Sequence, residues 1–481
     1  MLGLLSMGVV IFISCKKEHS CEGCSDNKNN KPPIAVAGPD QVITLPTDSV
    51  SLDGSTSHDL DGTISSFQWS KVSGPVSFNI NNAAAARTVV KNLAAGIYQF
   101  ELKVTDAGAL TGKDTMQVIV NAHAVTGSCA NRPVINVNLI PIGNLSSARI
   151  GLQCATAGNK ILFIGGSHSG QNWWNEPVPV DIYDISNNTW SVHLLVPDNP
   201  QFTHFRYGAG VTSVGNEIFI AGGGDGFGDN QTSRVDIYDA STNTWSTAEL
   251  SAARQGLVAA TVGDKVLFAG GFGYPDGSNW GEFNTVDIYD NSNNSWSTAT
   301  LSQARMDITA TTAGSKIYFA GGFIGGINAS KTIDIYDVVT NSWSVSSLQQ
   351  PRTWMASIFA GGKIFWAGGA NIWNGAEWVN NDNTEILDLS SGVTSSVCIL
   401  PRSRFSAVTK NENIVFFTSY GSDPRNGTHF EIYNLTTNTW STGVLPVKIQ
   451  GSSIISVNNT IYVAGGNVNG SFSNQVWKLE F

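Results

Sequence analysis

Charged residues are scarce in this sequence, at 13% of 481 positions, and acidic residues outnumber basic ones. The formal net charge of -10 argues against a general affinity for nucleic acid, because phosphate binding needs a surplus of Lys and Arg. Long helix-forming runs are also lacking, whereas 50 glycines and 14 tryptophans are present. This composition predicts an all-β chain of many short strands, and its length predicts two or more domains.

The N-terminal apolar run, Leu2 to Ile13, is too short to span a bilayer as a helix but suits the core of a signal peptide. Ser14 and Cys15 follow it, and this pattern resembles a bacterial lipobox, whose cysteine becomes lipid-modified after cleavage. The resemblance implies a signal peptide at 1–14, lipidation at Cys15 and a polar tether at 15–32. It places the protein in a cell envelope of the Bacteroidetes type, lipid-anchored to the outer membrane on either its periplasmic or its surface side.

The other cysteines include two candidate pairs. Cys21 and Cys24 have the CxxC spacing of a zinc or redox site, but no second pair accompanies them, so a small local disulfide or no bond is favoured over a metal. Cys129 and Cys154 flank the start of the large repeat region, and we expect that an oxidising compartment would allow them to bridge.

Residues 33–122 contain alternating segments such as "SSFQWSKV" and "IYQFELKVTD", with Gly, Asn and Asp turns between them. This pattern predicts one β-sandwich. The same segment resembles an immunoglobulin-like PKD-type module of the REJ-like branch, which implies a spacer or adhesion unit. Asp59 and Asp61 lie on one turn; they supply too few oxygens for calcium, so an Asx-type turn is the favoured interpretation.

From 133 to 481, after a linker at 123–132, the sequence repeats with a period of about 50 residues. An apolar run ends in Gly-Gly, an aromatic strand such as "VDIYD" follows, and a tryptophan comes at a fixed distance. This pattern resembles the kelch repeat and implies a seven-bladed β-propeller of four-stranded antiparallel blades, similar to the propeller of galactose oxidase. The last repeat lacks its fourth strand, so we expect a strand near Val137 to Leu139 to complete that blade.

A cation opens the first strand of each repeat, and the propeller arranges these cations as a ring on one face. The residues are Arg149, Arg206, Arg254, Arg305, Arg352, Arg404 and Lys448. The long loops expected on the same face carry tryptophans outside the repeat positions. These are Trp173, Trp174, Trp280, Trp373 and Trp378. Together they suggest a ligand-binding face for an acidic glycan or a carboxylate-bearing peptide. The alternative is structural: the arginines bond loop carbonyls or the acids Asp181, Asp236, Asp287, Asp334 and Glu431, and the tryptophans pack on one another.

Enzymatic chemistry finds little support. Copper radical oxidases of the kelch class need Tyr and His copper ligands, and the propeller histidines, His168, His193, His204 and His429, form no Tyr-His pair. A fold analogy to sialic acid mutarotase remains, with Arg254, Arg305, Glu282 and Glu377 as the groups it would recruit. The leading hypothesis is a lipid-anchored binding protein without catalytic residues, metal or cofactor, whose partner is a glycan or an envelope protein. The other hypothesis is a pure protein-interaction scaffold.

Overall fold

The computed structural model describes residues 30–481, apart from 45–46, 76, 94–95, 122–128, 169–177, 196–205, 225–229, 276, 278, 326–327, 374–377, 401–402 and 421–426. The chain divides into two compact units, Met1–Ala122 and His123–Phe481. Over the described ranges the protein is all-β, and its only helical segment is the short 3-10 turn η1 (Cys129–Asn131). No helix in these ranges is long and apolar enough to cross a membrane.

The first unit is an immunoglobulin-like sandwich of two sheets, as predicted. One sheet has the order β1-β7-β6-β3 and the other β2-β5-β4. The strands are β1 (Gln41–Thr44), β2 (Val50–Asp53), β3 (Ile64–Ser73), β4 (Asn79–Ile80), β5 (Arg87–Lys91), β6 (Gly96–Asp106) and β7 (Thr111–Asn121). Alternation along β6 buries every second side chain, so Tyr98, Phe100 and Leu102 form the core with Trp69 from β3.

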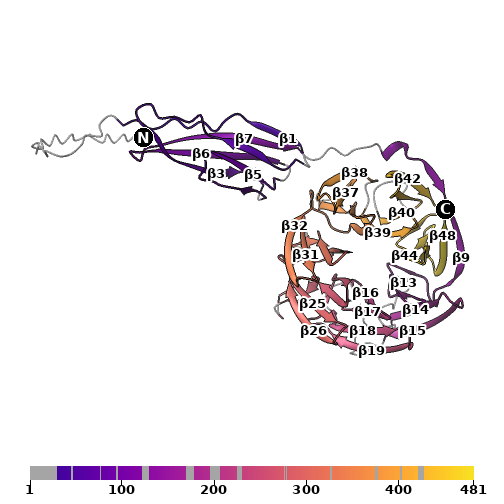
Figure 1. Ribbon diagram of the computed structural model, residues 1–481. Helices are drawn as coiled ribbons and strands as arrows, with labels where there is room; N and C mark the ends of the chain where they lie inside the picture. The colour runs from indigo at the N-terminus through magenta and orange to yellow at the C-terminus, as the bar shows by residue number, and fades with distance from the viewer. Residues whose placement is uncertain are drawn as a thin grey trace, which may run out of the picture. The chain divides into compact units, whose positions relative to one another are not determined.

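The second unit is a ring of antiparallel sheets, which we number as blades in chain order (Figure 1). Blade 1 is β11 (Gln153–Ala157), β12 (Lys160–Ile164), β14 (Val178–Asp184) and β15 (Thr189–Leu195); blade 2 is β16 (Gly210–Val214), β17 (Glu217–Ala221), β18 (Arg234–Asp239) and β19 (Thr244–Glu249); blade 3 is β21 (Val258–Val262), β22 (Lys265–Ala269), β25 (Thr285–Asp290) and β26 (Ser295–Thr300). Blade 4 is β27 (Thr309–Ala313), β28 (Lys316–Ala320), β31 (Thr332–Asp337) and β32 (Ser342–Ser347); blade 5 is β33 (Ala356–Ala360), β34 (Lys363–Ala367), β37 (Asn383–Asp388) and β38 (Thr394–Cys398). Blade 6 is β39 (Ser403–Lys410), β40 (Asn413–Tyr420), β41 (His429–Asn434) and β42 (Thr439–Val444), with β8 (Val134–Asn136) added; blade 7 is β44 (Ser453–Val457), β45 (Thr460–Ala464), β48 (Gln475–Glu480) and β9 (Asn138–Asn144).

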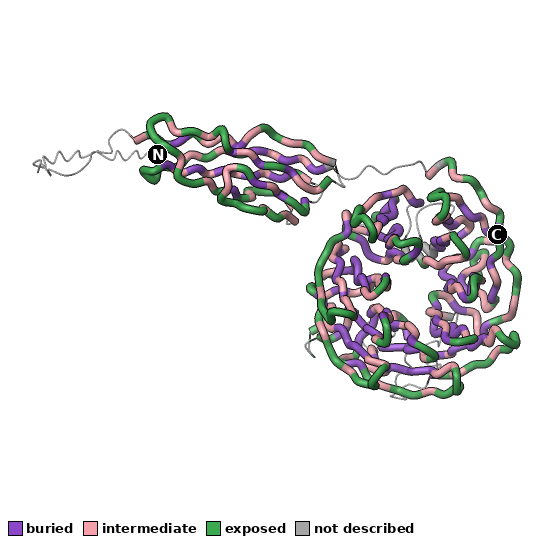
Figure 2. Tube along the Cα trace, viewed as in Figure 1, coloured by how far each residue is buried: buried purple, intermediate pink, exposed green. Residues whose placement is uncertain are grey.

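The first strand of each blade lies toward the centre of the ring and the fourth at the rim. Neighbouring first strands contact one another in chain order, and β44 of blade 7 also contacts β11 of blade 1. The second strands are the most buried, because they are packed on both faces, whereas the outer strands are largely exposed (Figure 2). The repeated Tyr and Trp pack against each other: Tyr238 lies 5.0 Å from Trp245, and Trp245 stacks on His193 of the preceding blade.

The segment that enters the ring is shared between blades 6 and 7. β8 pairs in parallel with β42, and β9 pairs antiparallel with β48, with Leu139 opposite Leu479. The strand expected near Val137 to Leu139 therefore corresponds to β9, which is longer and begins one residue later. The first and last strands of blade 7 thus come from opposite ends of the unit.

The disulfide expectation was wrong. Cys129 bonds to Cys398 at the end of β38 in blade 5, and Cys154 is a free thiol. Cys154 lies on the first strand of blade 1, where it contacts Ser453 of blade 7 at 3.1 Å. Cys15, Cys21 and Cys24 lie outside the described residues.

Short strands stand at one end of the ring, beyond the Gly-Gly pairs. They are β10 (Arg149–Ile150), β13 (Ser167–His168), β20 (Arg254–Gln255), β23 (Phe272–Gly273), β24 (Gly281–Glu282), β29 (Phe323–Ile324), β30 (Asn328–Ala329), β35 (Ala370–Trp373), β36 (Trp378–Asn380), β43 (Ile449–Gln450), β46 (Asn467–Val468) and β47 (Ser471–Phe472). In blades 4 and 5 they join into one sheet of order β29-β30-β35-β36. We call this end of the ring the loop face.

Candidate functional site

The arginines at the loop face are buried rather than exposed. Arg149, Arg254, Arg305 and Arg352 have no exposed surface, and Arg206 is 5% exposed. Each forms an ion pair with the third strand of its own blade. The pairs are Arg149–Asp181, Arg206–Asp236, Arg254–Asp287, Arg305–Asp334 and Arg352–Glu385. Each guanidinium also donates to the carbonyl of the first glycine of its Gly-Gly pair, sixteen residues later in every case.

The paired acids are occupied as well. The second carboxylate oxygen of Asp334 accepts a hydrogen bond from the backbone N–H of Ser302 at 2.8 Å, and that of Asp287 accepts one from Ser251 at 3.0 Å. Burial lowers the pKa of Arg305, and the carboxylate of Asp334 opposes that shift. These arginines therefore hold the third strand and the Gly-Gly turn together, which corrects the expectation that they bind an acidic ligand. The mutarotase-like use of Arg254 and Arg305 loses its support for the same reason.

Of the two remaining cations, Lys448 lies outside the ring. Lys448 is exposed. Ile449 begins β43 as Arg254 begins β20, so Ile449 occupies in blade 7 the position of the buried arginines, which we call the ring position. Ile449 is fully buried. Arg404 lies on β39, but its side chain is outside the described residues.

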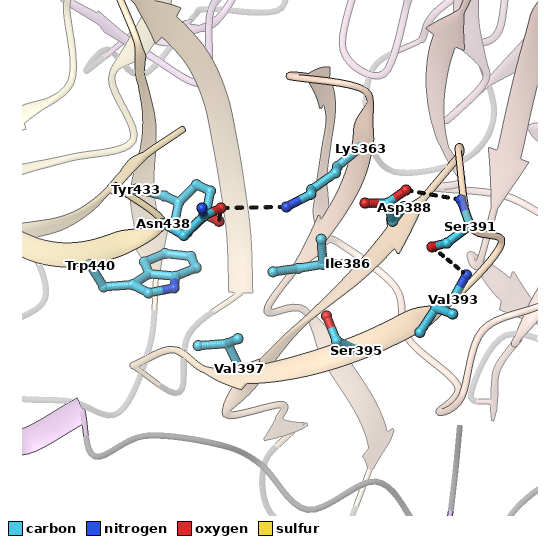
Figure 3. Close-up of a pocket in the computed structure, with 10 residues that line it drawn as sticks. All are labelled: Lys363, Ile386, Asp388, Ser391, Val393, Ser395, Val397, Tyr433, Asn438 and Trp440. Atoms are coloured by element: carbon cyan, nitrogen blue, oxygen red, sulfur yellow. Dashed lines mark hydrogen bonds between the residues drawn. The ribbon is translucent and has the colours of Figure 1, made fainter. Parts of the chain in front are cut away.

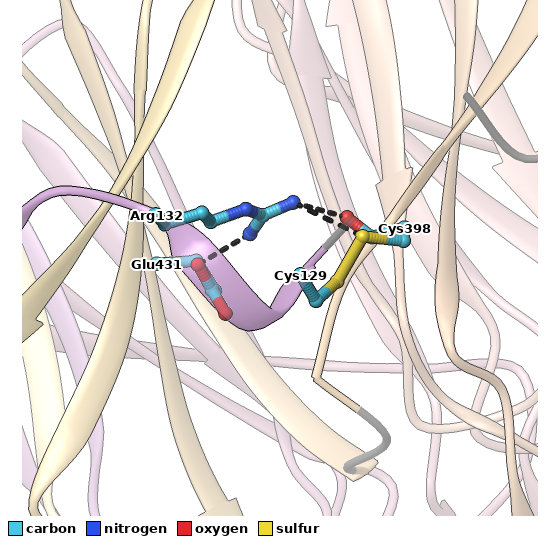
Figure 4. Close-up of a disulfide and its surroundings, with 4 residues drawn as sticks. All are labelled: Cys129, Arg132, Cys398 and Glu431. Atoms are coloured by element: carbon cyan, nitrogen blue, oxygen red, sulfur yellow. Dashed lines mark hydrogen bonds and ion pairs between the residues drawn. A yellow bond between two sulfur atoms is a disulfide. The ribbon is translucent and has the colours of Figure 1, made fainter. Parts of the chain in front are cut away.

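In blade 6 an arginine of the entering segment binds the buried acid of the third strand (Figure 4). Arg132 pairs with the buried Glu431 at 2.5 Å and donates to the backbone oxygen of Cys398 at 2.5 Å. Its guanidinium also lies 4.6 Å from the ring centroid of Trp440. The acid expected to pair with a strand-one arginine is thus bound by a residue next to the Cys129–Cys398 disulfide.

Trp280 is the one loop tryptophan whose side chain is described. It is 39% exposed and lies near the tip of the β23–β24 hairpin of blade 3, with Tyr274 beside it at 41%. The Trp280 ring packs edge-on against Tyr274 at 4.8 Å and against Phe272 at 4.4 Å. The base of the hairpin rests on Arg254, whose guanidinium lies 5.6 Å from the ring of Phe283. A supported aromatic cluster therefore faces solvent at the loop face.

The other loop tryptophans are placed only in part. The backbones of Trp373 and Trp378 pair with each other between β35 and β36, but their side chains lie outside the described residues, as do Trp173 and Trp174 entirely. One aromatic residue of this face was missed in the sequence: Trp354 is half-buried, and its indole N–H donates to Asp307 at 2.9 Å. In blades 1 to 3 a glycine lies two residues after the ring arginine, and in blade 5 Trp354 stands at that position. This replacement was the signal in the sequence.

A recess of about 510 Å³ lies between blades 5 and 6 at the rim (Figure 3). Ile386, Val397 and Trp440 form its apolar wall, and Lys363 lies across it, 3.4 Å from the side-chain oxygen of Asn438. The corresponding Lys265 of blade 3 instead pairs with Asp290 at 2.7 Å. The recess thus has an apolar wall and a polar edge.

Asp61 of the acidic turn and Asp106 at the end of β6 hold the chain that enters the sandwich. Asp61 accepts a hydrogen bond from the backbone N–H of Lys31 at 3.0 Å, and Asp106 accepts one from the side chain of Asn30 at 2.9 Å. Both fix the chain that enters the sandwich. Across the described parts of both units, no group of three or more His, Cys, Asp or Glu residues lies where it would hold a metal ion.

Comparison with known families assigns both units. Residues 37–120 match the PKD domain family of the KIAA0319-like type, and residues 151–369 match the KLHDC2/KLHL20/DRC7 Kelch-repeats domain. The chain thus carries a KIAA0319-like PKD domain followed by a Kelch-repeat domain, as the sequence predicted. These are domains of an adhesion or protein-interaction module.

The curated relatives match over a limited part of this chain. The dyslexia-associated protein KIAA0319-like protein of Mus musculus is 43% identical over 93 residues, 19% of this chain and 9% of that protein. Dyslexia-associated protein KIAA0319 of Homo sapiens is 41% identical over 93 residues, with the same coverage. Low-density lipoprotein receptor-related protein 11 of Homo sapiens is 34% identical over 103 residues, 21% of this chain and 20% of that protein. The chain spans no more than about a fifth of the length of these relatives.

Proposed function

We propose that this chain, with its KIAA0319-like PKD domain and its Kelch-repeat domain, is a lipid-anchored binding protein of a bacterial cell envelope. The PKD domain serves as a spacer or adhesion unit. The Kelch-repeat domain holds a protein partner on its loop face. Lipidation of Cys15 and the polar tether that follows attach the two domains to the outer membrane.

The observation that carries a protein partner is the aromatic cluster of Phe272, Tyr274 and Trp280. Exposed Trp and Tyr side chains are the residues most enriched at the centres of protein interfaces, because they bury a large area with few rotatable bonds. Trp280 is held by its two ring neighbours and by the hairpin beneath it, so little entropy is lost when a partner covers it. The buried ion pairs argue in the same direction, since they leave the ring arginines no charge to offer an acidic ligand.

The extracytoplasmic location is supported by the Cys129–Cys398 disulfide, because such bonds persist in oxidising compartments. The lipid anchor is tested by labelling cells with an alkyne-bearing fatty acid. Wild-type protein is expected to carry the label and a Cys15→Ser variant to lose it. A variant that keeps the label would contradict the anchor without affecting the binding proposal.

The protein partner is tested by placing a photo-crosslinking amino acid at Tyr274 and irradiating the two-domain protein in envelope extracts. We expect a discrete protein adduct that disappears when Trp280→Ser is added. Val345→Ser, which changes an exposed residue on the outer strand β32, serves as the matched control and is expected to leave the adduct intact. No adduct, or one that Trp280→Ser leaves unchanged, would refute this face as the protein site.

A glycan is the second candidate ligand, and a separate observation favours it. The half-buried Trp354 is hydrogen-bonded to a carboxylate at the same end of the ring.

A further inference from the structure

The residue two positions after the ring position has a left-handed backbone in blades 1 to 5 and in blade 7. Four of these blades have glycine there: Gly151, Gly208, Gly256 and Gly451, with φ between 64° and 67°. Blade 4 instead has Asp307 at φ 50° and blade 5 has Trp354 at φ 52°. Only glycine adopts this conformation without a steric cost, and for a residue as bulky as tryptophan it is an outlier.

These positions follow one another around the inner part of the ring. The backbone N–H of Gly151 donates to the carbonyl of Gly451 at 2.8 Å, Gly256 donates to Gly208 at 2.8 Å, and Asp307 donates to Gly256 at 3.0 Å. Each bond joins neighbouring blades. Asp307 and Trp354 therefore belong to an inner circle of turns at the loop face, on adjacent blades.

Their side chains form one unit. The indole N–H of Trp354 donates to Oδ2 of Asp307 at 2.9 Å, and the Trp354 ring packs edge-on against Phe323 at 4.9 Å. The other carboxylate oxygen of Asp307 lies over Gly256, only 3.2 Å from where a β-carbon would stand. The glycine of blade 3 thus leaves room for the carboxylate, and the unit extends across three blades.

The pair also lies at the base of the sheet that joins the loops of blades 4 and 5. Met306, next to Asp307, bridges to Phe323 of β29, and Thr353, next to Trp354, bridges to Ala370 of β35. Strained residues persist where the surrounding structure fixes them, and they concentrate at functional sites. Glycine at these two positions would satisfy the fold, as it does in four other blades, so folding does not explain the tryptophan.

We propose that Trp354 and Asp307 form a subsite for a neutral sugar. An indole ring offers a flat apolar surface to the C–H face of a pyranose, and a carboxylate accepts hydrogen bonds from its hydroxyl groups. The carboxylate disfavours an acidic sugar, and the buried arginines are neutralised by their own acids. This inference deepens the proposed binding function and rests on it only for the use of the loop face.

The test compares wild-type two-domain protein with Trp354→Gly and Asp307→Gly on an array of neutral and sialylated oligosaccharides, followed by calorimetric titration of each sugar retained. Both substitutions restore the residue found in other blades, so thermal unfolding should show that the variants fold. We expect wild-type protein to retain a neutral sugar and each variant to bind it at least roughly tenfold more weakly. Asp307→Asn, which tolerates the left-handed backbone, separates loss of charge from loss of shape.

Trp280→Ala serves as the control on the same face and is expected to leave sugar binding unchanged. The proposal fails if wild-type protein retains no neutral sugar, if both glycine variants bind it as wild type does, or if Trp280→Ala weakens it equally. The crosslink at Tyr274 reports on the protein partner alone. A failed sugar subsite with an intact crosslink, or the reverse, therefore distinguishes this inference from the proposed function.

Discussion

Ile449 and Trp477 share one buried apolar cluster in blade 7, at the two positions that hold Arg254 and Asp287 in blade 3. Trp477 lies opposite Val463 on its ladder just as Asp287 lies opposite Phe268. One blade has thus replaced both partners of a buried ion pair. Replacing both partners of a buried ion pair by apolar residues often leaves the stability unchanged or increases it. Replacing only one partner leaves the other charge buried and unpaired.

Removing one member of a ring ion pair is expected to destabilise the Kelch-repeat domain strongly. Arg305→Ile leaves Asp334 buried among backbone groups, and we expect the free energy of unfolding to fall by about 3–5 kcal/mol. Adding Asp334→Leu should recover a large part of that loss. Denaturant titrations of the single and double variants measure both values, with Lys448→Ala as an exposed control. A single variant as stable as wild type would show that the pair is dispensable.

The disulfide is expected to stabilise the entering segment. Because Cys129 and Cys398 are separated by 269 residues, the bond restricts the unfolded chain strongly, and its loss should cost about 2–4 kcal/mol. Thermal unfolding of Cys129→Ser/Cys398→Ser measures the loss. Wild-type protein in reductant should approach the double variant, and the double variant itself should not respond to reductant. Equal melting temperatures for all samples would contradict a stabilising bond.

The position of β9 between blades 7 and 1 is tested at Gly143. A β-carbon there would come within 2.5 Å of the indole nitrogen of Trp190, so Gly143→Ala should destabilise the Kelch-repeat domain by about 1–3 kcal/mol. Ile140→Ala changes an exposed residue of the same strand and is expected to have little effect. Calorimetry distinguishes the two. Deleting 133–142 should be worse than either, and a deletion with an unchanged melting temperature would refute the pairing of β9 with β48.

The Cys154 thiol is expected to react slowly. Burial raises its pKa to about 11, against a smaller opposing effect of the hydrogen bond from Ser453. The folded state therefore keeps the proton at pH values where an unfolded chain forms thiolate, and the thiolate is the reactive species. Alkylation followed by mass spectrometry at pH 8 should show Cys154 modified far more slowly in native protein than in denatured protein, with the native rate still rising between pH 9 and 11. A native rate equal to the denatured rate would contradict this.

The repeat itself was predictable because its signals are local. Tyr183 and Trp190 lie on the two strands of one hairpin, where they pair and their rings pack, and the same short spacing recurs in other blades. The role of the arginines was not predictable in the same way, since Arg149 and Asp181 lie on strands that only the register brings together. Both roles were open at the level of sequence, and burial decides for the structural one.

Other features depend on contacts that no spacing encodes. A search for one cation per blade selects Lys448, although the ring position in blade 7 is the neighbouring Ile449. Cys129 and Cys398 are 269 residues apart in the chain, and they meet because the entering segment packs beside the end of β38. Trp354 was missed because the identity of a single residue does not reveal its backbone conformation. An alignment of the repeats would have placed Trp354 at the position of Gly208 and Gly256, two residues after the arginine.

The pairing of β9 with β48 also sets an order of events during synthesis. Residues 138–144 leave the ribosome more than three hundred residues before their partners at 475–480. Until those partners arrive, blade 7 has no sheet for β9 to join, and the apolar side of the early strand stays uncovered. The ring therefore completes only after the last strand has been made, and until then the unfinished blade is open to aggregation.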